Sequence, residues 1–189
     1  MRFTAAQDFT SLTDLLRLYS DADEIGFKSH CRLDESEIAE ACHRARRLAH
    51  HWRLHHEGLT PEEVAGRLGC RVLREPFHRA GQIAGGKVIY LAECYFPPRA
   101  AEATIRVNTD AIHSLAVVMA QWANETERQW FTEVKISEVA IAHELFHLIE
   151  QRSSSALAEL EAHAFARAFT ALPFSPLLYN KLLSRLKTR

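Results

Sequence analysis

The residues best suited to chemistry stand at positions 143–147, where the chain reads His-Glu-Leu-Phe-His. The flanking residues are mostly apolar and predict a largely buried helix. On a helix, residues four apart lie on one face, so the imidazoles of His143 and His147 can share one metal ion. Glu144 is rotated by about 100° from His143, which lets it reach a water molecule at the metal without being a ligand. Two nitrogen ligands and a free carboxylate are what a zinc hydrolase needs.

Chance alone rarely produces this pattern. With 11 histidines among 189 residues, a His-Glu-x-x-His sequence is expected on the order of 0.06 times. The competing interpretation is a pair of ordinary core histidines held by hydrogen bonds. Buried polar groups without partners are costly, and this apolar stretch carries two imidazoles and a carboxylate together. We therefore favour a metal site.

A zinc site of this kind needs a third protein ligand and one open position. A second predicted helix, at residues 156–166, follows a short polar turn, and we expect it to fold back antiparallel onto the first. Glu159 and His163 share one face of it, whereas Glu161 points elsewhere and reads as a solvated carboxylate. The pattern favours Glu159 as the third ligand and His163 as a supporting group or substrate contact. Glu161 and His163 are the alternative ligands.

These two motifs resemble those of the ImmA/IrrE-type metallopeptidases. That family has a His-Glu-Leu-Gly-His helix followed by a helix reading Glu-x-Glu-Ala-Asn-x-Phe-Ala. Here residues 159–166 read Glu-Leu-Glu-Ala-His-Ala-Phe-Ala, and Leu172-Pro173 follows. The resemblance covers about residues 59–175, but its specific part is the two helices. The usual metal ligand of the family, the first Glu of the second motif, corresponds to Glu159.

The chain departs from the family pattern at three places. Phe146 stands where the family favours Gly, and we expect it to reshape the floor of the cleft. His163 stands where Asn or Asp is usual, which alters the surroundings of the ligands. The Leu-Met-Pro end of the family motif is reduced to Ala171-Leu172-Pro173.

The resemblance implies a fold class, an activity and a class of substrate. The fold would be α+β and zincin-like, mostly helical, with a sheet of about three strands packed against the motif-bearing helix. The activity would be that of a zinc-dependent endopeptidase acting on a cytosolic protein, in this family often a helix-turn-helix transcriptional repressor. The alternative is a catalytically inactive, metal-binding interaction module of a regulatory, phage or mobile-element system.

Composition restricts the partners. The length of 189 residues suits one domain, with residues 1–33 as an N-terminal helical extension and 34–189 as the metallopeptidase-like unit. The net charge of -1 and the absence of a basic patch with interleaved aromatics argue against direct nucleic-acid binding. No apolar run reaches the length of a membrane span. The expected partner is a protein or peptide substrate.

The cysteines point to a reducing compartment. The chain has four of them, scattered and without a Cys-x-x-Cys pair, and the first residues lack the apolar core of a signal peptide. This combination predicts a cytoplasmic protein.

Start signals and apolar spacing predict the remaining elements. The motif-bearing helix is expected to begin at Ser137-Glu138. A small, mostly antiparallel sheet is expected from three strands, with a turn at 82–87. We expect an extended peptide to pair with the second or third strand. The predicted strands are 72–73, 88–92 and 103–108. Further helices are predicted within 11–21, 34–52, 60–69, 112–122 and 175–186.

A second group of histidines lies between residues 43 and 56. His51 and His55 are four apart and could form a metal pair, but four arginines lie among the histidines and no carboxylate separates them. Positive neighbours oppose cation binding, so we expect a solvated basic face. For the developing oxyanion of a peptide substrate, the candidate donors are His163, Tyr90, His113 and Tyr179.

Overall fold

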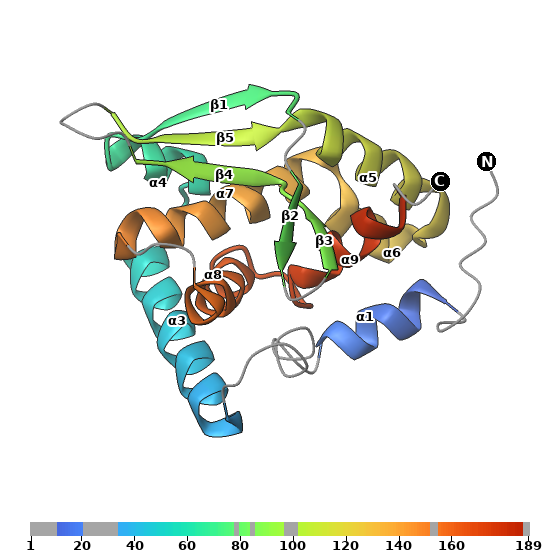
Figure 1. Ribbon diagram of the computed structural model, residues 1–189, viewed down its shortest axis with the longest axis horizontal. Helices are drawn as coiled ribbons and strands as arrows, with labels where there is room; N and C mark the ends of the chain where they lie inside the picture. The colour runs from blue at the N-terminus through green and yellow to red at the C-terminus, as the bar shows by residue number, and fades with distance from the viewer. Residues whose placement is uncertain are drawn as a thin grey trace.

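The protein is described from a computed structural model (Figure 1), which describes residues 11–20, 34–77, 80–83, 86–96, 102–151 and 155–186. The side chains of residues 80–88 and 186 are outside this description. The chain combines many helices with a small sheet, so the α+β class is confirmed. The predicted turn centre at 84–85 lies outside the described residues.

The main sheet has three strands in the order β1-β5-β4, formed by Arg71–Glu75, Thr104–Asn108 and Ala92–Tyr95. β1 pairs with β5 in parallel and β4 pairs with β5 antiparallel. The expectation of a mostly antiparallel sheet is therefore wrong, and the sheet is mixed. The parallel pair arises because a hairpin and β4 lie between β1 and β5 along the chain, which gives room for a crossover.

The strand predicted at 88–92 is two strands. Its first half belongs to β3 (Gly86–Ile89), which pairs antiparallel with β2 (Ala80–Ile83) in a separate two-stranded sheet. Its second half begins β4, and the change of direction falls at Tyr90 and Leu91. Apolar composition alone did not mark this break, because Tyr90 and Leu91 are themselves good strand formers.

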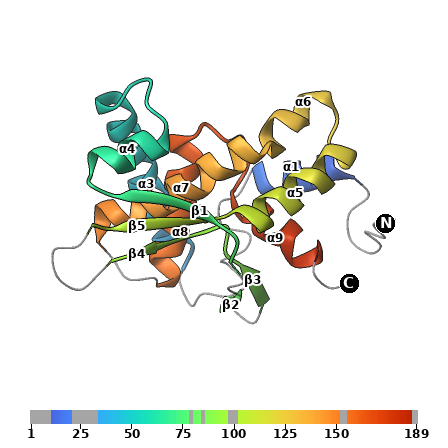
Figure 2. The same cartoon turned by 90° about the horizontal axis from the view of Figure 1, so that it is seen from above.

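The motif-bearing helix is α7 (Glu133–Glu150), and it packs beneath β4 and β5 (Figures 1 and 2). Its N-cap is Thr132, whose side chain accepts a hydrogen bond from the backbone N–H of Lys135. The predicted start at Ser137-Glu138 is therefore wrong by one helical turn. Thr132 also belongs to the preferred N-cap residues, and the buried Ile136 extends the apolar face back to it.

The second motif lies on α8 (Ala156–Phe169), which packs against both α7 and α3 (Glu35–His55). Figure 1 shows α8 almost end-on while α7 runs across the view, so the two helices cross steeply instead of lying antiparallel as expected. The crossing brings the start of α8 over the second half of α7. Most alanines of α3 and α8 are buried and allow close packing of these two helices.

The predicted start of α3 is confirmed by a capping box between Asp34 and Glu37. Its apolar stripe is also confirmed, with Ile38, Ala45 and Ala49 fully buried. The remaining helices are α1 (Leu12–Ser20), α4 (Pro61–Arg67), α5 (Thr109–Trp122), α6 (Glu125–Arg128), the 3₁₀ helix η1 (Gln129–Phe131) and α9 (Leu177–Leu186).

The N-terminal helix α1 shares the core of the rest of the chain. Its Leu12, Leu15 and Tyr19 are buried in the same hydrophobic cluster as α9. The backbone N–H of Ser175 donates to the carbonyl of Tyr19, which ties α1 to the segment before α9. The boundary predicted between residues 33 and 34 stays a prediction. Among the described residues, no helix combines the length and apolar content needed to cross a membrane.

Two glycines near the end of α4 give a matched test of this description. Gly69 has φ +73°, in the left-handed region in which glycine often ends a helix, whereas Gly66 lies inside α4. A Cβ added at either position meets no atom within 4 Å, so backbone conformation alone sets the effect. We expect Gly66→Ala to stabilise the protein by about 0.5–1 kcal/mol and Gly69→Ala to destabilise it by about 1 kcal/mol.

Urea denaturation of the two variants measures both changes. Equal effects of the same sign would show that the helix end is not where the structure has it.

Candidate metal centre

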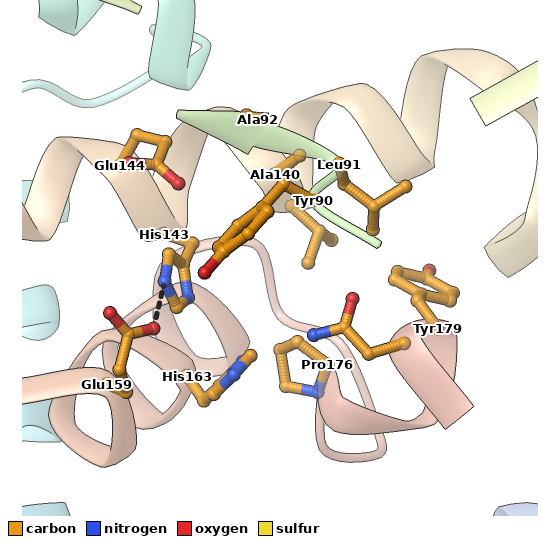
Figure 3. A pocket seen from close by; sticks show the side chains of 12 residues that line it. Tyr90, Leu91, Ala92, Ala140, His143, Glu144, Glu159, His163, Pro176 and Tyr179 are labelled. Atoms are coloured by element: carbon orange, nitrogen blue, oxygen red, sulfur yellow. Dashed lines mark hydrogen bonds and ion pairs between the residues drawn. The ribbon is translucent and has the colours of Figure 1, made fainter. Parts of the chain in front are cut away.

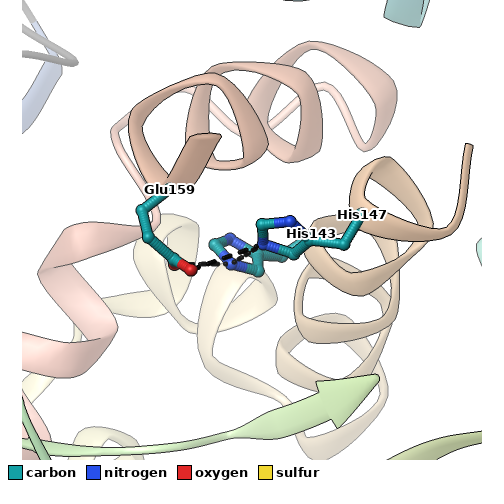
Figure 4. A group of neighbouring side chains, drawn as sticks. All are labelled: His143, His147 and Glu159. Atoms are coloured by element: carbon teal, nitrogen blue, oxygen red, sulfur yellow. Dashed lines mark hydrogen bonds and ion pairs between the residues drawn. The ribbon is translucent and has the colours of Figure 1, made fainter. Parts of the chain in front are cut away.

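Three ligand-type atoms converge where α8 crosses α7 (Figure 4). The Nε2 atoms of His143 and His147 lie 3.3 Å apart, and the Glu159 carboxylate oxygens lie 3.2 Å from the first and 3.5 Å from the second. Within the described chain, this is the group of three or more His, Cys, Asp or Glu side chains placed to hold a metal ion. His147 is 6% exposed, so the centre is shielded from bulk water.

The spacing of these atoms fits a metal centre. Ligands about 2.0–2.1 Å from a tetrahedral zinc ion lie about 3.3–3.4 Å from one another. The three distances, 3.2, 3.3 and 3.5 Å, bracket this value, with His143 measured to Oε2 of Glu159 and His147 to Oε1. Two nitrogens and one carboxylate oxygen form a donor set that zinc accepts, with the fourth position left for water or substrate.

The protonation of the two histidines differs. Burial, followed by the neighbouring His143, lowers the pKa of His147 to about 4, so its imidazole is neutral at pH 7. Burial also acts to lower the pKa of His143, but the hydrogen bond and the charge of Glu159 outweigh it and the pKa is raised. A metal ion taking the place of the His143 proton would keep the favourable contact with Glu159, because only the neutral imidazole ligates.

Glu144 lies beside this cluster but outside it. The side chain is 8% exposed and lines the same pocket as His143 and Glu159. Burial raises the pKa of Glu144 to about 7, even though it accepts a hydrogen bond from the backbone N–H of Cys94 in β4. The carboxyl group therefore stands between the metal centre and the edge of the sheet.

Glu161, the alternative ligand on α8, is in a different environment. It is 1% exposed and forms an ion pair with Arg44 of α3. The interpretation of Glu161 as a solvated carboxylate is therefore wrong, because α3 covers this face of α8. The sequence could not show it, since the two partners lie 117 residues apart.

His163, the other alternative, is 5% exposed and lies with its ring centre 4.5 Å from that of His143. Burial and the nearby His143 lower the pKa of His163 well below its usual range, so the ring is neutral. It lines the pocket (Figure 3) but does not join the three converging atoms. This position suits the supporting or substrate-contacting role predicted for it.

Phe146 does not reshape the cleft. It is 2% exposed and packs against Phe165 of α8, with ring centres 5.7 Å apart. The expectation that it alters the cleft floor is wrong, because its ring packs against Phe165 inside the α7–α8 crossing and is not among the residues that line the pocket.

The predicted oxyanion donors separate into two groups. Tyr90, Tyr179 and His163 line the pocket beside the metal centre. His113 is exposed and bonds to Glu133 with its Nδ1 2.7 Å from the carboxylate, so it is not a donor here. The Tyr179 hydroxyl donates to the carbonyl of Trp130 at 2.5 Å and is already committed. Tyr90 and His163 remain the better placed donors.

The histidines of α3 form no second centre. His51 and His55 are exposed with ring centres 4.1 Å apart, but among the described residues no third ligand joins them. The prediction of a solvated basic face agrees with this exposure.

Sequence reasoning missed the residues that complete the pocket. Leu91 follows β3, Val139 and Ala140 lie on α7 one turn before His143, and Pro176 and Asn180 come from the C-terminal segment. Val139 and Ala140 lie four and three residues before His143, a spacing that places them on the same face of the helix and could have indicated them. Of the C-terminal segment only Tyr179 was predicted at the site, and nothing in the sequence indicated that Pro176 and Asn180 would join it.

No protein-family model, curated protein or solved structure matches this chain. The resemblance to the ImmA/IrrE metallopeptidases therefore stays a prediction from the two motifs. What the site can do is argued below from its own geometry.

Metal binding tests the centre directly. We expect the purified protein to take up one Zn²⁺ per chain and His147→Ala to weaken binding by more than about 100-fold, since even removal of a group that merely orients a ligand costs 10–100-fold. His55→Ala, an exposed histidine on α3, is the matched control and should bind as the wild type does. A chelator should lower the melting temperature of the wild type by about 5–10 °C.

Competition with a zinc-sensitive dye gives the affinities, and calorimetry the melting temperatures. Equal zinc affinity of the His147 and His55 variants would rule out this centre.

The Arg44–Glu161 pair predicts a stability effect. Replacing Arg44 by Met withdraws a charged hydrogen-bond donor from a buried carboxylate, and we expect a loss of about 1.5–3 kcal/mol. Arg47→Met, an exposed arginine on the same helix, should change stability by less than about 0.5 kcal/mol. Chemical denaturation compares the two. A loss no larger for Arg44 than for Arg47 would mean that Glu161 does not depend on this partner.

Proposed function

We propose that this chain is a zinc-dependent endopeptidase with a zincin-like catalytic unit. The main support for the proposal is the 3.2–3.5 Å spacing of His143, His147 and Glu159. A second carboxylate, Glu144, lies beside them and is not one of the candidate ligands. A merely structural zinc site is closed by four protein ligands. Here a pocket lies next to the three candidate ligands, where substrate can enter.

A zinc ion held by these three side chains would polarise a substrate carbonyl and increase the acidity of water. The chain's own residues handle the proton. Glu144 accepts it from the attacking water and delivers it to the leaving amine. A carboxyl group whose pKa burial raises to about 7 is matched to this exchange near neutral pH. Tyr90 or His163 would donate to the oxyanion from the pocket walls.

The sheet offers a place for the peptide backbone. Of the two strands expected to receive substrate, the one predicted at 103–108 is β5, which is paired on both sides. In the described sheet, β4 is paired with β5 alone and lies directly over α7. Ala92 of β4 lines the pocket and Cys94 of β4 contacts Glu144. An extended peptide added to β4 would therefore place a carbonyl near the metal centre.

The substrate class rests on the resemblance and on the sequence. By analogy with the ImmA/IrrE metallopeptidases, the substrate is a protein, in particular a transcriptional repressor. The cytosolic location proposed for the enzyme and its substrate rests on the scattered cysteines, of which Cys70 and Cys94 are free thiols.

Glu144→Gln tests the catalytic role. Glutamine keeps the size of the side chain but cannot accept the proton, so we expect kcat/KM for a peptide substrate to fall by about 10²–10⁴-fold while zinc stoichiometry is unchanged. Glu133→Gln, on the exposed first turn of α7, is the matched control and should retain full activity. Cleavage of a denatured protein or a peptide mixture, followed by mass spectrometry, supplies the readout.

Unchanged cleavage in Glu144→Gln would remove Glu144 from the chemistry. Stoichiometric zinc without any cleavage by the wild type would favour the alternative of a metal-binding interaction module.

A further inference from the structure

The pocket beside the metal centre extends away from it along α7 toward the C-terminal helix α9 (Figure 3). Its empty volume of about 480 Å³ includes the open solvent at its mouth, so the enclosed part is sized for a single side chain.

The walls of this extension are mostly apolar. Val139 and Ala140 form the α7 wall, Leu91 comes from the link between β3 and β4, and Pro176 and Tyr179 come from the C-terminal segment. Asn180 adds a single amide group. A charged side chain would lose its hydration here without an opposite charge among these residues.

Tyr179 makes the far wall rigid. The side chain is fully buried, its hydroxyl donates to the carbonyl of Trp130, and its ring packs edge-on against Phe131 and Phe174. Because the hydroxyl of Tyr179 is hydrogen-bonded to Trp130, the side chain contributes its ring to the pocket wall. Such a wall is preorganised for an apolar group.

The distance from the metal centre matches the reach of a peptide side chain. Val139 and Ala140 precede His143 by four and three residues, which places them about one turn, or 5.4 Å, along α7. With consecutive Cα atoms 3.8 Å apart, a carbonyl held at the metal centre leaves the side chain of the adjoining residue at about this distance. The small side chains of Ala140 and Ala92 leave the space open.

We infer that this pocket selects substrates by an apolar side chain, of the size of Leu, Met or Phe, on a residue next to the cleaved bond. The C-terminal helix α9, through Tyr179 and the preceding Pro176, is then a specificity-determining element of the site. This inference rests on the proposed peptidase function and deepens it by naming the class of substrate residue.

Hydroxamates test the pocket by binding alone, without any cleavage. The zinc-loaded full chain is titrated with acetohydroxamate, 4-methylpentanohydroxamate and 3-phenylpropanohydroxamate, whose shared head group chelates zinc while the tail grows. We expect the two larger tails to bind at least about tenfold more tightly than acetohydroxamate, because they bury additional apolar groups. In Ala140→Leu the new side chain fills the pocket, so the larger hydroxamates should bind less than about twofold more tightly than acetohydroxamate.

Control measurements separate filling of the pocket from damage to the metal centre or to α7. Acetohydroxamate should bind Ala140→Leu as it binds the wild type, which shows that the metal centre is intact. Ala39 is an exposed alanine on α3, and Ala39→Leu should show the same increase in affinity with tail size as the wild type. Ala92→Val narrows the pocket from β4 and should reduce the gain independently of any disturbance of α7.

The inference is overturned if the wild type shows no gain with tail size, or if both pocket variants keep the full gain. Failure of all three hydroxamates to bind the zinc-loaded wild type would instead overturn the metal centre and the proposed function, and the inference with them. Cleavage of matched peptides with Asp, Ala or Leu at the residues flanking the bond should follow the same order, with Leu preferred at least about tenfold.

Discussion

The structure depends on holding two imidazole nitrogens and a carboxylate group together in a largely buried position, with distances of 3.2–3.5 Å between them. Bringing such groups together removes them from water, which is costly unless each is partnered. A divalent cation satisfies all three at once, and the tetrahedral spacing of their atoms suits one. The crossing of α7 and α8 is the feature that fixes this arrangement, because each helix supplies its ligands from a single face.

The rest of the fold supports that crossing from three sides. α3 packs behind α8 and neutralises Glu161 with Arg44, which leaves Glu159 as the carboxylate directed at the histidines. The sheet covers α7 and positions Glu144 through the backbone N–H of Cys94. α9 closes the far end of the pocket, with Tyr179 tied to Trp130. Each support comes from a different part of the chain, so the site depends on the whole fold.

Much of this arrangement could be predicted where the information was local. The face shared by His143 and His147, the face shared by Glu159 and His163, and the end of α4 at Gly69 all followed from helical periodicity or cap chemistry. The wrong predictions concern features that tertiary packing determines. Thr132 and Ser137 are both suitable caps by sequence, and the burial of Ile136 favours the first. Glu161 looked solvated because its partner lies on a distant helix. Of the C-terminal segment only Tyr179 was predicted at the site, because the sequence does not show how α9 packs.

We propose that one zinc ion is bound by His143, His147 and Glu159. The decisive experiment is a crystal of the zinc-loaded protein measured on both sides of the zinc absorption edge. We expect one anomalous peak, about 2.0–2.2 Å from the Nε2 atoms of His143 and His147 and from a carboxylate oxygen of Glu159. A peak bound instead by Glu161 or His163, or no peak between α7 and α8 at saturating zinc, would contradict it.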